Sequence, residues 1–205
     1  MRFLRSYSLL ALVLLYGGAA IAQPAPQTLS HRVPEQTWKA EIKSFGGSAP
    51  FSLNDDKGKV ILLAVWAYWC KPCLNAMNEL AKIQEDFAGQ NVAVVGISLY
   101  YSFPDDKRGA IDYVQYSKFK FKMGWINEEI GGLLMADDAE VPNFMLINSD
   151  GVLVERILGF NPAKTRALLR DELQKLLKSR ASSEKKEAES KMFQLREARA
   201  VNKKE

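Results

Sequence analysis

The chain has 205 residues, of which 47% are hydrophobic and 25% charged, and these are ordinary values for a globular protein. Its 28 basic residues exceed its 24 acidic residues by only four, and Arg2 and Arg5 account for two of the basic ones. The rest of the chain is close to electrical balance, so the sequence carries no nucleic-acid-binding footprint. It is long enough for one domain with a substantial core.

The first 22 residues have the three-part pattern of a secretory signal peptide. Arg2 and Arg5 precede the apolar run LLALVLLYGG, and the small residues from Ala20 to Ala22 form a cleavage site before Gln23. An uncleaved membrane anchor is the alternative, but this run is shorter than the roughly 20 residues that a spanning helix needs. We therefore predict a cleaved signal peptide over residues 1–22 and a periplasmic protein.

An extended leader is predicted over residues 23–36, because this segment has three prolines and no hydrophobic period. One folded domain is expected to follow over residues 37–179. From Thr37 to Phe45 apolar and polar residues alternate, which predicts a half-buried strand at the start of this domain.

The centre of the chain predicts a strand, a helix and a second strand. KVILLAVW, residues 59–66, is a continuous apolar run typical of a strand buried on both faces. Apolar residues then recur at helical spacing until Gly89, and NVAVVGISL, residues 91–99, is a second buried run. This order predicts a βαβ unit with parallel strands and a right-handed crossover.

The next segment predicts three shorter elements. A helix is expected from Asp105 or Asp106 to about Lys118, followed by a strand within residues 119–125. A weaker helix is expected over residues 128–135, where two glycines lower the helix propensity.

The last part of the predicted domain reads as a hairpin and a helix. Strands at 143–148 and 152–158 flank Ser149-Asp150-Gly151, and Asp-Gly is a strong hairpin signal. A helix should begin after Asn161, an N-cap residue followed by proline, with leucines along one face. Residues 180–205 then form a charged tail of mixed sign, which we expect to be helical or disordered and which includes one apolar patch, a candidate docking helix.

The two cysteines, Cys70 and Cys73, admit three interpretations. A C-x-x-C pair closes almost no loop, so it stabilises little as a structural disulfide. A closed zinc site needs four ligands, and the chain offers only two cysteines and His31, so no metal site is predicted. The third interpretation is a redox-active pair, and its position between a buried strand and a helix favours it.

A cysteine at a helix N-terminus is expected to be reactive, because unpaired N–H groups and the helix dipole favour the thiolate. Cys70 is therefore the predicted nucleophile, and Cys73, one turn into the helix, the resolving thiol. Lys71 adds a favourable positive charge, while Pro72 fixes the backbone and contributes no competing donor. No cofactor other than the Cys70–Cys73 disulfide is expected.

Two segments carry a resemblance to a known family: WAYWCKPC after KVILLAV, and VPNFMLINSDG further on. From about Thr37 to Leu177 the chain resembles the thioredoxin superfamily, and within it the TlpA/ResA-like group of secreted thiol-disulfide oxidoreductases. The resemblance implies a three-layer α/β fold with a central mixed sheet flanked by helices. We expect this fold to carry an N-terminal β extension and, over residues 180–205, a C-terminal charged tail that is helical or disordered.

The resemblance also implies further site residues. The peptide bond before Pro142 would be cis, and Val141 would offer its backbone to an extended substrate beside the cysteines. A simple strand-initiating proline is the alternative. Trp66 and Trp69 would flank the active-site surface, although aromatic residues before a turn are also often part of a core.

The chain departs from the family pattern at four positions. Acidic residues common beneath the cysteines are replaced by Ala64 and Ala76, a proline by Asn78, and the threonine after the cis-proline by Asn143. Such acids assist proton transfer from the resolving thiol. The usual route to rapid reduction, which uses these acids, is therefore missing. Lys71 or water would have to take the proton of the resolving thiol.

The resulting hypothesis is a periplasmic thiol-disulfide oxidoreductase that reduces disulfides of exported proteins, as in cytochrome c maturation or metal-centre assembly. The resemblance implies a membrane thiol-disulfide carrier as electron donor, and we expect a monomer that does not bind nucleic acid. Two alternatives are a copper(I)-handling or protein-binding module with a non-cycling pair, and a peroxiredoxin-like antioxidant enzyme.

Overall fold

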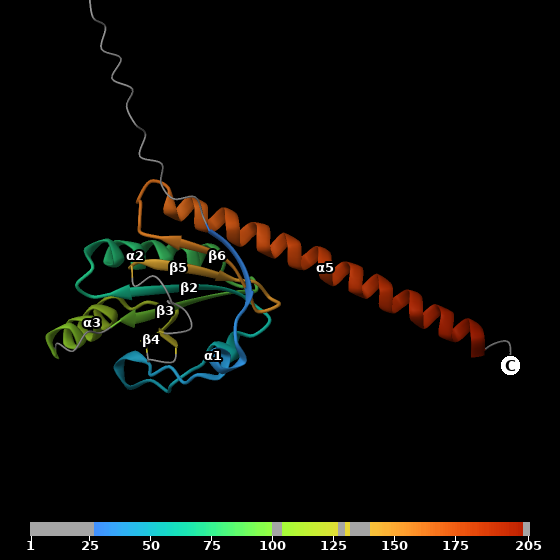
Figure 1. The fold of residues 1–205 in the computed structure, drawn as a ribbon, viewed down its shortest axis with the longest axis horizontal. Helices are drawn as coiled ribbons and strands as arrows, with labels where there is room; N and C mark the ends of the chain where they lie inside the picture. The colour runs from blue at the N-terminus through green and yellow to red at the C-terminus, as the bar shows by residue number, and fades with distance from the viewer. Residues whose placement is uncertain (1–26, 100–103, 127–129, 132–139, 203–205) are drawn as a thin grey trace, which may run out of the picture.

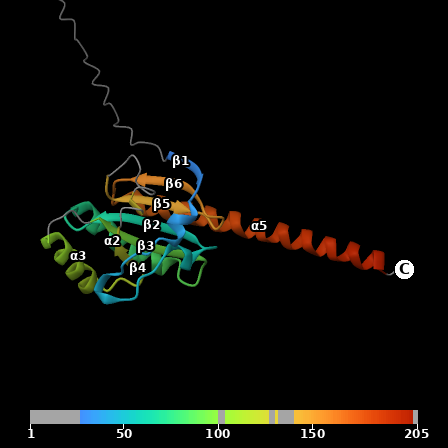
Figure 2. The same ribbon diagram turned by 60° about the horizontal axis from the view of Figure 1, so that its bottom comes forward.

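The computed structural model describes residues 27–99, 104–126, 130–131 and 140–202. They form a mixed six-stranded sheet in the order β1-β6-β5-β2-β3-β4, with helices packed on it (Figure 2). This confirms the predicted fold class. The strands are β1 (Gln27–Arg32), β2 (Val60–Ala67), β3 (Val92–Leu99), β4 (Lys122–Trp125), β5 (Asn143–Ile147) and β6 (Val152–Leu158). The helices are α1 (Glu35–Lys39), α2 (Lys71–Asp86), α3 (Pro104–Ser117) and α5 (Thr165–Asn202), with two 3₁₀ turns, η1 (Phe45–Gly47) and η2 (Leu53–Asp56).

Strand β2 lies in the middle of the sheet, and all its residues are buried. It pairs in parallel with β3 and antiparallel with β5, so its backbone from Ile61 to Val65 is paired on both sides. Helix α2 connects β2 to β3, as predicted for the βαβ unit. A continuous apolar run was the signal for this strand because both of its faces meet a core.

The two faces of the sheet carry separate apolar cores. On one face, the side chains of α2, α3 and α5 pack against residues such as Leu62 and Leu146. On the other face, Trp38 of α1 and Ile130 pack against residues such as Leu63 and Met145. The sheet therefore forms the middle one of three layers.

The predicted strand at 37–45 is wrong, and the N-terminal strand lies earlier in the chain. Residues Glu35–Lys39 form helix α1, which starts after an extended Pro34 and places Trp38 in the core. Ile42 makes only an isolated antiparallel bridge to Phe51. Instead, β1 pairs antiparallel with β6, so part of the predicted leader is a strand of the sheet.

The last helix starts later than predicted and is longer. Asn161 forms a polar turn, in which its Oδ1 accepts from the Ala163 N–H and its own N–H donates to Thr165 Oγ1, and α5 begins at Thr165. Leu169 and Leu173 of α5 are buried against the sheet, as the leucine spacing predicted.

The charged tail is part of α5, which runs as one helix to Asn202. The C-terminal part of this helix projects beyond the sheet (Figure 1). The expectation of a helical or disordered tail thus resolves to a helix. Within this extension Met192, Phe193 and Leu195 are exposed on its surface. Its ion pairs, such as Lys191 with Glu187, are of the i,i+4 kind that stabilises an isolated helix.

Several predictions fall outside the described residues. They include the signal peptide at 1–22 and nearly all of the weak helix at 128–135. Among the residues that the structure describes, no helix is long and apolar enough to cross a membrane.

Helix α5 is attached to the sheet partly through a pair of carboxyl groups. Glu155 of β6 shares a hydrogen bond with Glu172 of α5, and Lys175 pairs with Glu172. Burial, followed by the charge and hydrogen bond of Glu172, raises the pKa of Glu155 to about 7, and Lys175 opposes this only in part. The pair therefore holds a proton up to near-neutral pH.

This raised pKa predicts a pH-dependent stability. Because folded Glu155 binds its proton more tightly than the unfolded chain does, folding stability should fall as pH rises from about 4.5 to about 7. At pH 8 the Glu155→Gln variant should be more stable than the wild type by about 1 kcal/mol after solvent screening, and at pH 4 no more stable. Urea unfolding at both pH values measures this. Glu189→Gln, on the exposed part of α5, serves as the control, and an equal gain at both pH values would contradict the prediction.

Candidate active site

The two cysteines lie where strand β2 ends and helix α2 begins. After Ala67 the chain turns through Tyr68 and Trp69, and the Cys70 N–H donates to the Ala67 carbonyl at 3.2 Å. Cys70 is the N-cap residue of α2, with Pro72 in the first turn. The sequence produces this junction because a buried strand stops at the sheet edge and proline suits a helix start.

Cys70 and Cys73 form a disulfide with a Cα–Cα distance of 5.2 Å. Cys70 retains 6% exposure whereas Cys73 has none, so only Cys70 can be reached from solvent. The Cys73 N–H donates to Cys70 Sγ at 3.2 Å. The same N–H would stabilise a Cys70 thiolate in the reduced state, because it is one of the unpaired donors of the helix start.

The segment before β5 lies against the cysteines, as the resemblance implied. The Val141–Pro142 peptide bond is cis, which confirms that prediction. The Val141 carbonyl oxygen lies 3.7 Å from Cys70 Sγ, although the two residues are 71 positions apart. Val141 is half-buried and Pro142 is buried, so the backbone of Val141 sits at the rim of the site.

The other predicted site residues divide into exposed and buried ones. Lys71 and Pro72 are exposed on the first turn of α2, and Trp69 is 52% exposed beside Cys70. Trp66 does not flank the surface as expected. It points into the core from fully buried β2, with its ring 5.8 Å from that of Tyr113, so the alternative of a core tryptophan is correct.

No carboxylate occupies the positions beneath the pair where the family pattern places acids. Ala64 and Ala76 are both buried in the core around the cysteines. Glu79, the nearest acid along α2, is paired with Lys82 and Arg166. Proton transfer from Cys73 therefore cannot use a side chain at either of the two alanine positions.

Asn143, which follows the cis-proline, is a polar residue whose burial the sequence did not reveal. Its side chain is fully buried, and neither its Oδ1 nor its Nδ2 has a hydrogen-bond partner among the described residues. Since Phe144 contributes to the core beneath α2, the preceding Asn143 points to the opposite face of the sheet. A buried amide without partners is destabilising by about 1–3 kcal/mol.

Replacing this amide by an apolar side chain should therefore stabilise the protein. We expect Asn143→Leu to raise the free energy of unfolding by about 1–3 kcal/mol, measured by urea denaturation. Asn148→Leu is a matched control with the opposite expected sign, because Asn148 Oδ1 accepts from the Asp150 and Val152 N–H groups. A loss of stability in Asn143→Leu would show that the amide is satisfied, for example by a buried water.

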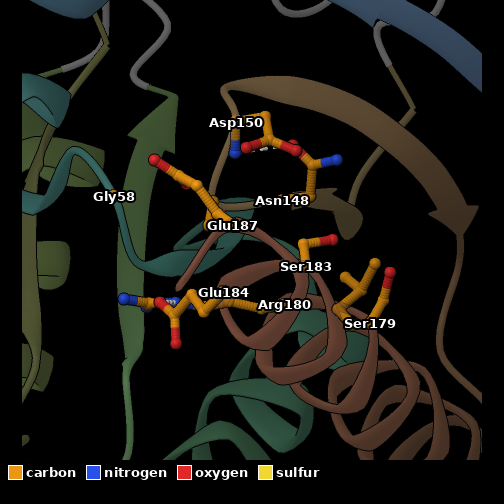
Figure 3. Close-up of a pocket in the computed structure, with 10 residues that line it drawn as sticks. Gly58, Asn148, Asp150, Ser179, Arg180, Ser183, Glu184 and Glu187 are labelled. Atoms are coloured by element: carbon orange, nitrogen blue, oxygen red, sulfur yellow. Dashed lines mark hydrogen bonds and ion pairs between the residues drawn. The ribbon is translucent and has the colours of Figure 1, made fainter. Parts of the chain in front are cut away.

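A hollow lies away from the cysteines, between the β5–β6 turn and α5 (Figure 3). It measures about 300 Å³, and three of its charged residues are already in ion pairs: Arg180 Nε with Glu184, and Glu187 with Lys191. In the described part of the chain, no group of three or more histidine, cysteine or acidic residues could hold a metal ion. The cysteine pair is thus the strongest candidate site.

A mixed sheet, a C-x-x-C disulfide at the start of α2 and a facing cis-proline together define a thioredoxin-like protein. The family model of the AhpC/TSA family matches residues 30–156, which is more than half of the chain. The chain belongs to this family.

Named relatives are similar over parts of the chain. Thioredoxin-like protein YneN from Bacillus subtilis is 40% identical over 67 residues, which are 33% of this chain and 38% of YneN. Thiol-disulfide oxidoreductase ResA from Bacillus cereus is 27% identical over 125 residues, 60% of this chain and 67% of ResA. The similarity to YneN therefore spans well under half of that relative.

Among solved structures, the fold is similar to a secreted Mycobacterium tuberculosis disulfide oxidoreductase described as homologous to E. coli DsbE. The two superpose with a TM-score of 0.55 at 19% identity, over 70% of this chain and all (100%) of the other. At this identity the similarity concerns the fold alone.

Proposed function

We propose that this protein is a thiol-disulfide oxidoreductase that reduces disulfides of exported proteins through Cys70 and Cys73. The observation that carries the proposal is the asymmetry of the pair at the start of α2. Cys70 is accessible and its sulfur accepts an N–H, while Cys73 is fully buried directly behind it. The relatives named ResA and YneN point to the same chemistry.

The reaction follows from this asymmetry. In the reduced protein, the Cys70 thiolate attacks one sulfur of a client disulfide, forms a mixed disulfide and releases the other client sulfur as a thiolate. The Cys73 thiol then loses its proton to water and attacks Cys70 Sγ. This closes the Cys70–Cys73 disulfide and releases the second client thiolate, so two electrons pass to the client.

The neighbouring residues have supporting roles in this proposal. Lys71 stabilises the thiolate by its charge, and Pro72 fixes the first turn of α2. Trp69 offers an exposed aromatic surface beside Cys70. The backbone of Val141, held by Pro142, aligns an extended client segment. Trp66 acts from the core, by supporting the strand end beneath the pair.

The cellular setting is proposed from the N-terminal pattern and from the relatives. The signal-like residues 1–22, together with a fold similar to a secreted oxidoreductase, favour the periplasm. There the oxidised pair would be reduced again by a membrane thiol-disulfide carrier. The protein would act as a monomer, with no cofactor beyond its own disulfide.

Trapping of clients tests this proposal directly. The Cys73→Ser variant should accumulate mixed disulfides with exported proteins, because nothing resolves them. The matched Cys70→Ser variant should trap essentially none, since Cys73 is buried. Non-reducing gels followed by mass spectrometry measure both. Equal trapping by the two variants, or none by either, would rule out the proposed roles.

The reduction potential decides the direction of electron flow. Equilibration of the wild-type pair with a dithiothreitol series should give a value near that of thioredoxin, about −270 mV, for a reductant. A value near about −120 mV would instead assign an oxidant that forms disulfides.

Peroxide reduction is a second candidate, favoured by the match to the AhpC/TSA family. The segment Trp66-Ala67-Tyr68-Trp69 before Cys70 lacks the proline and threonine expected shortly before a peroxidatic cysteine. We therefore expect no rapid consumption of hydrogen peroxide by the reduced protein. Rapid consumption would favour this candidate.

A further inference from the structure

Helix α3 carries a glycine directly under an aromatic ring of the active-site turn. A Cβ atom built on Gly109 would lie 2.2 Å from Tyr68 Cε1 and 2.6 Å from Cδ1 and Cζ. Real Cβ atoms essentially never approach a neighbour this closely. The ring of Tyr68 therefore occupies the space that any side chain at position 109 would need.

The backbone of Gly109 gives no other reason for glycine. Its φ is not among the positive values found at turn glycines such as Gly89 and Gly151. Inside a helix, glycine is less favourable than alanine, since it loses more conformational freedom on folding. The packing of Tyr68 is thus the structural feature that accounts for glycine at this position.

Tyr68 belongs to the turn that leads into Cys70. This turn is closed by the hydrogen bond from the Cys70 N–H to the Ala67 carbonyl, and it contains only Tyr68 and Trp69. Tyr68 is 38% exposed, with its ring lying on α3. Because Tyr68 and Trp69 are neighbours in this turn, the contact of the Tyr68 ring with α3 constrains the position of Trp69 next to Cys70.

The same helix also contacts the chain after Cys70. Tyr113, one helical turn beyond Gly109, donates its hydroxyl hydrogen to the Leu74 carbonyl at 2.9 Å. Leu74 lies in the first turn of α2. Because positions i and i+4 share a helix face, one face of α3 contacts the segments on both sides of the cysteine pair.

We propose that Gly109 is a positioning residue for the active site. By lacking a side chain, it lets Tyr68 lie on α3, which fixes the turn that presents Trp69 beside Cys70 to a protein client. This inference rests on the proposed function. It concerns the docking of a protein disulfide and not the sulfur chemistry itself, which the start of α2 controls.

The packing part is tested by a double-mutant cycle on stability. With Tyr68 present, Gly109→Ala should lower the folding equilibrium constant on the order of tenfold, because the ring must leave its place. In a Tyr68→Ala background the same change should raise the constant about threefold, since only helix propensity remains. Tyr68→Phe keeps the ring and should behave like the wild type in the cycle. A change of the same sign in both backgrounds would overturn the inference.

The functional part compares a large and a small substrate. Gly109→Ala should raise the KM for insulin disulfides severalfold, while the rate of exchange with dithiothreitol and the reduction potential of the Cys70–Cys73 pair stay at wild-type values. In the Tyr68→Ala background, Gly109→Ala should have no further effect on the KM for insulin. A matching loss of rate with dithiothreitol, or an unchanged KM with Tyr68 present, would overturn the role in positioning.

The two proposals fail in different ways. If the wild type neither reduces insulin nor equilibrates with dithiothreitol, the proposed function fails, and with it the role of Gly109 in docking. If the wild type is active and Gly109→Ala leaves the KM for insulin unchanged, only the inference about Gly109 fails. Circular dichroism of each variant, recorded before the assays, verifies that the protein compared is folded.

Discussion

The placement of the cysteine pair depends on the end of strand β2. This strand is buried along its whole length and pairs with β5 as far as Val65 and with β3 as far as Ala67, so the centre of the sheet fixes the position of Ala67. Four residues later α2 begins, and its first N–H groups have no partners within the helix. The sulfur of the cysteine that caps this helix therefore lies next to N–H donors whose positions are fixed. The reactivity proposed for Cys70 is a consequence of this junction more than of any single neighbouring side chain.

Two segments distant in sequence converge on this junction. The cis peptide before Pro142 brings the Val141 carbonyl to Cys70, and α3 reaches the turn before the cysteines and the first turn of α2. None of these contacts relies on a charged group. The packing of backbone and aromatic rings therefore sets the shape of the site, and charge enters mainly through the helix start and through Lys71.

The sequence predicted the central elements well because their signals are local. Continuous apolar runs indicated β2 and β3, and Asp150-Gly151 indicated the turn between β5 and β6. The prediction failed where tertiary contacts decide the local structure. The alternation from Thr37 to Phe45 fits a strand, but burial of Trp38 on the sheet favours a short helix there. Likewise, no pattern in Gln27–Arg32 indicated that this segment would pair with β6 as an edge strand.

The site followed the same division. The motif around Cys70 and Cys73 indicated the pair, and the resemblance indicated the cis-proline. Neither could show that Trp66 is core, that Asn143 is buried without partners, or that Gly109 lies under Tyr68. These properties depend on tertiary contacts across the sheet and between helices. Such contacts leave no local pattern in a single sequence.

The electrostatics of the pair pull its potential in two directions. The helix start and Lys71 stabilise the Cys70 thiolate, which favours the reduced form and makes a pair more oxidising. Cys73 lies in an apolar core next to alanines, where burial disfavours a thiolate and keeps its proton in place. Stabilisation of the reduced form is therefore confined to one sulfur. A reductant is compatible with this site because the buried Cys73 thiol gains no comparable stabilisation as a thiolate, so the reduced form is favoured less than it would be with two stabilised thiolates.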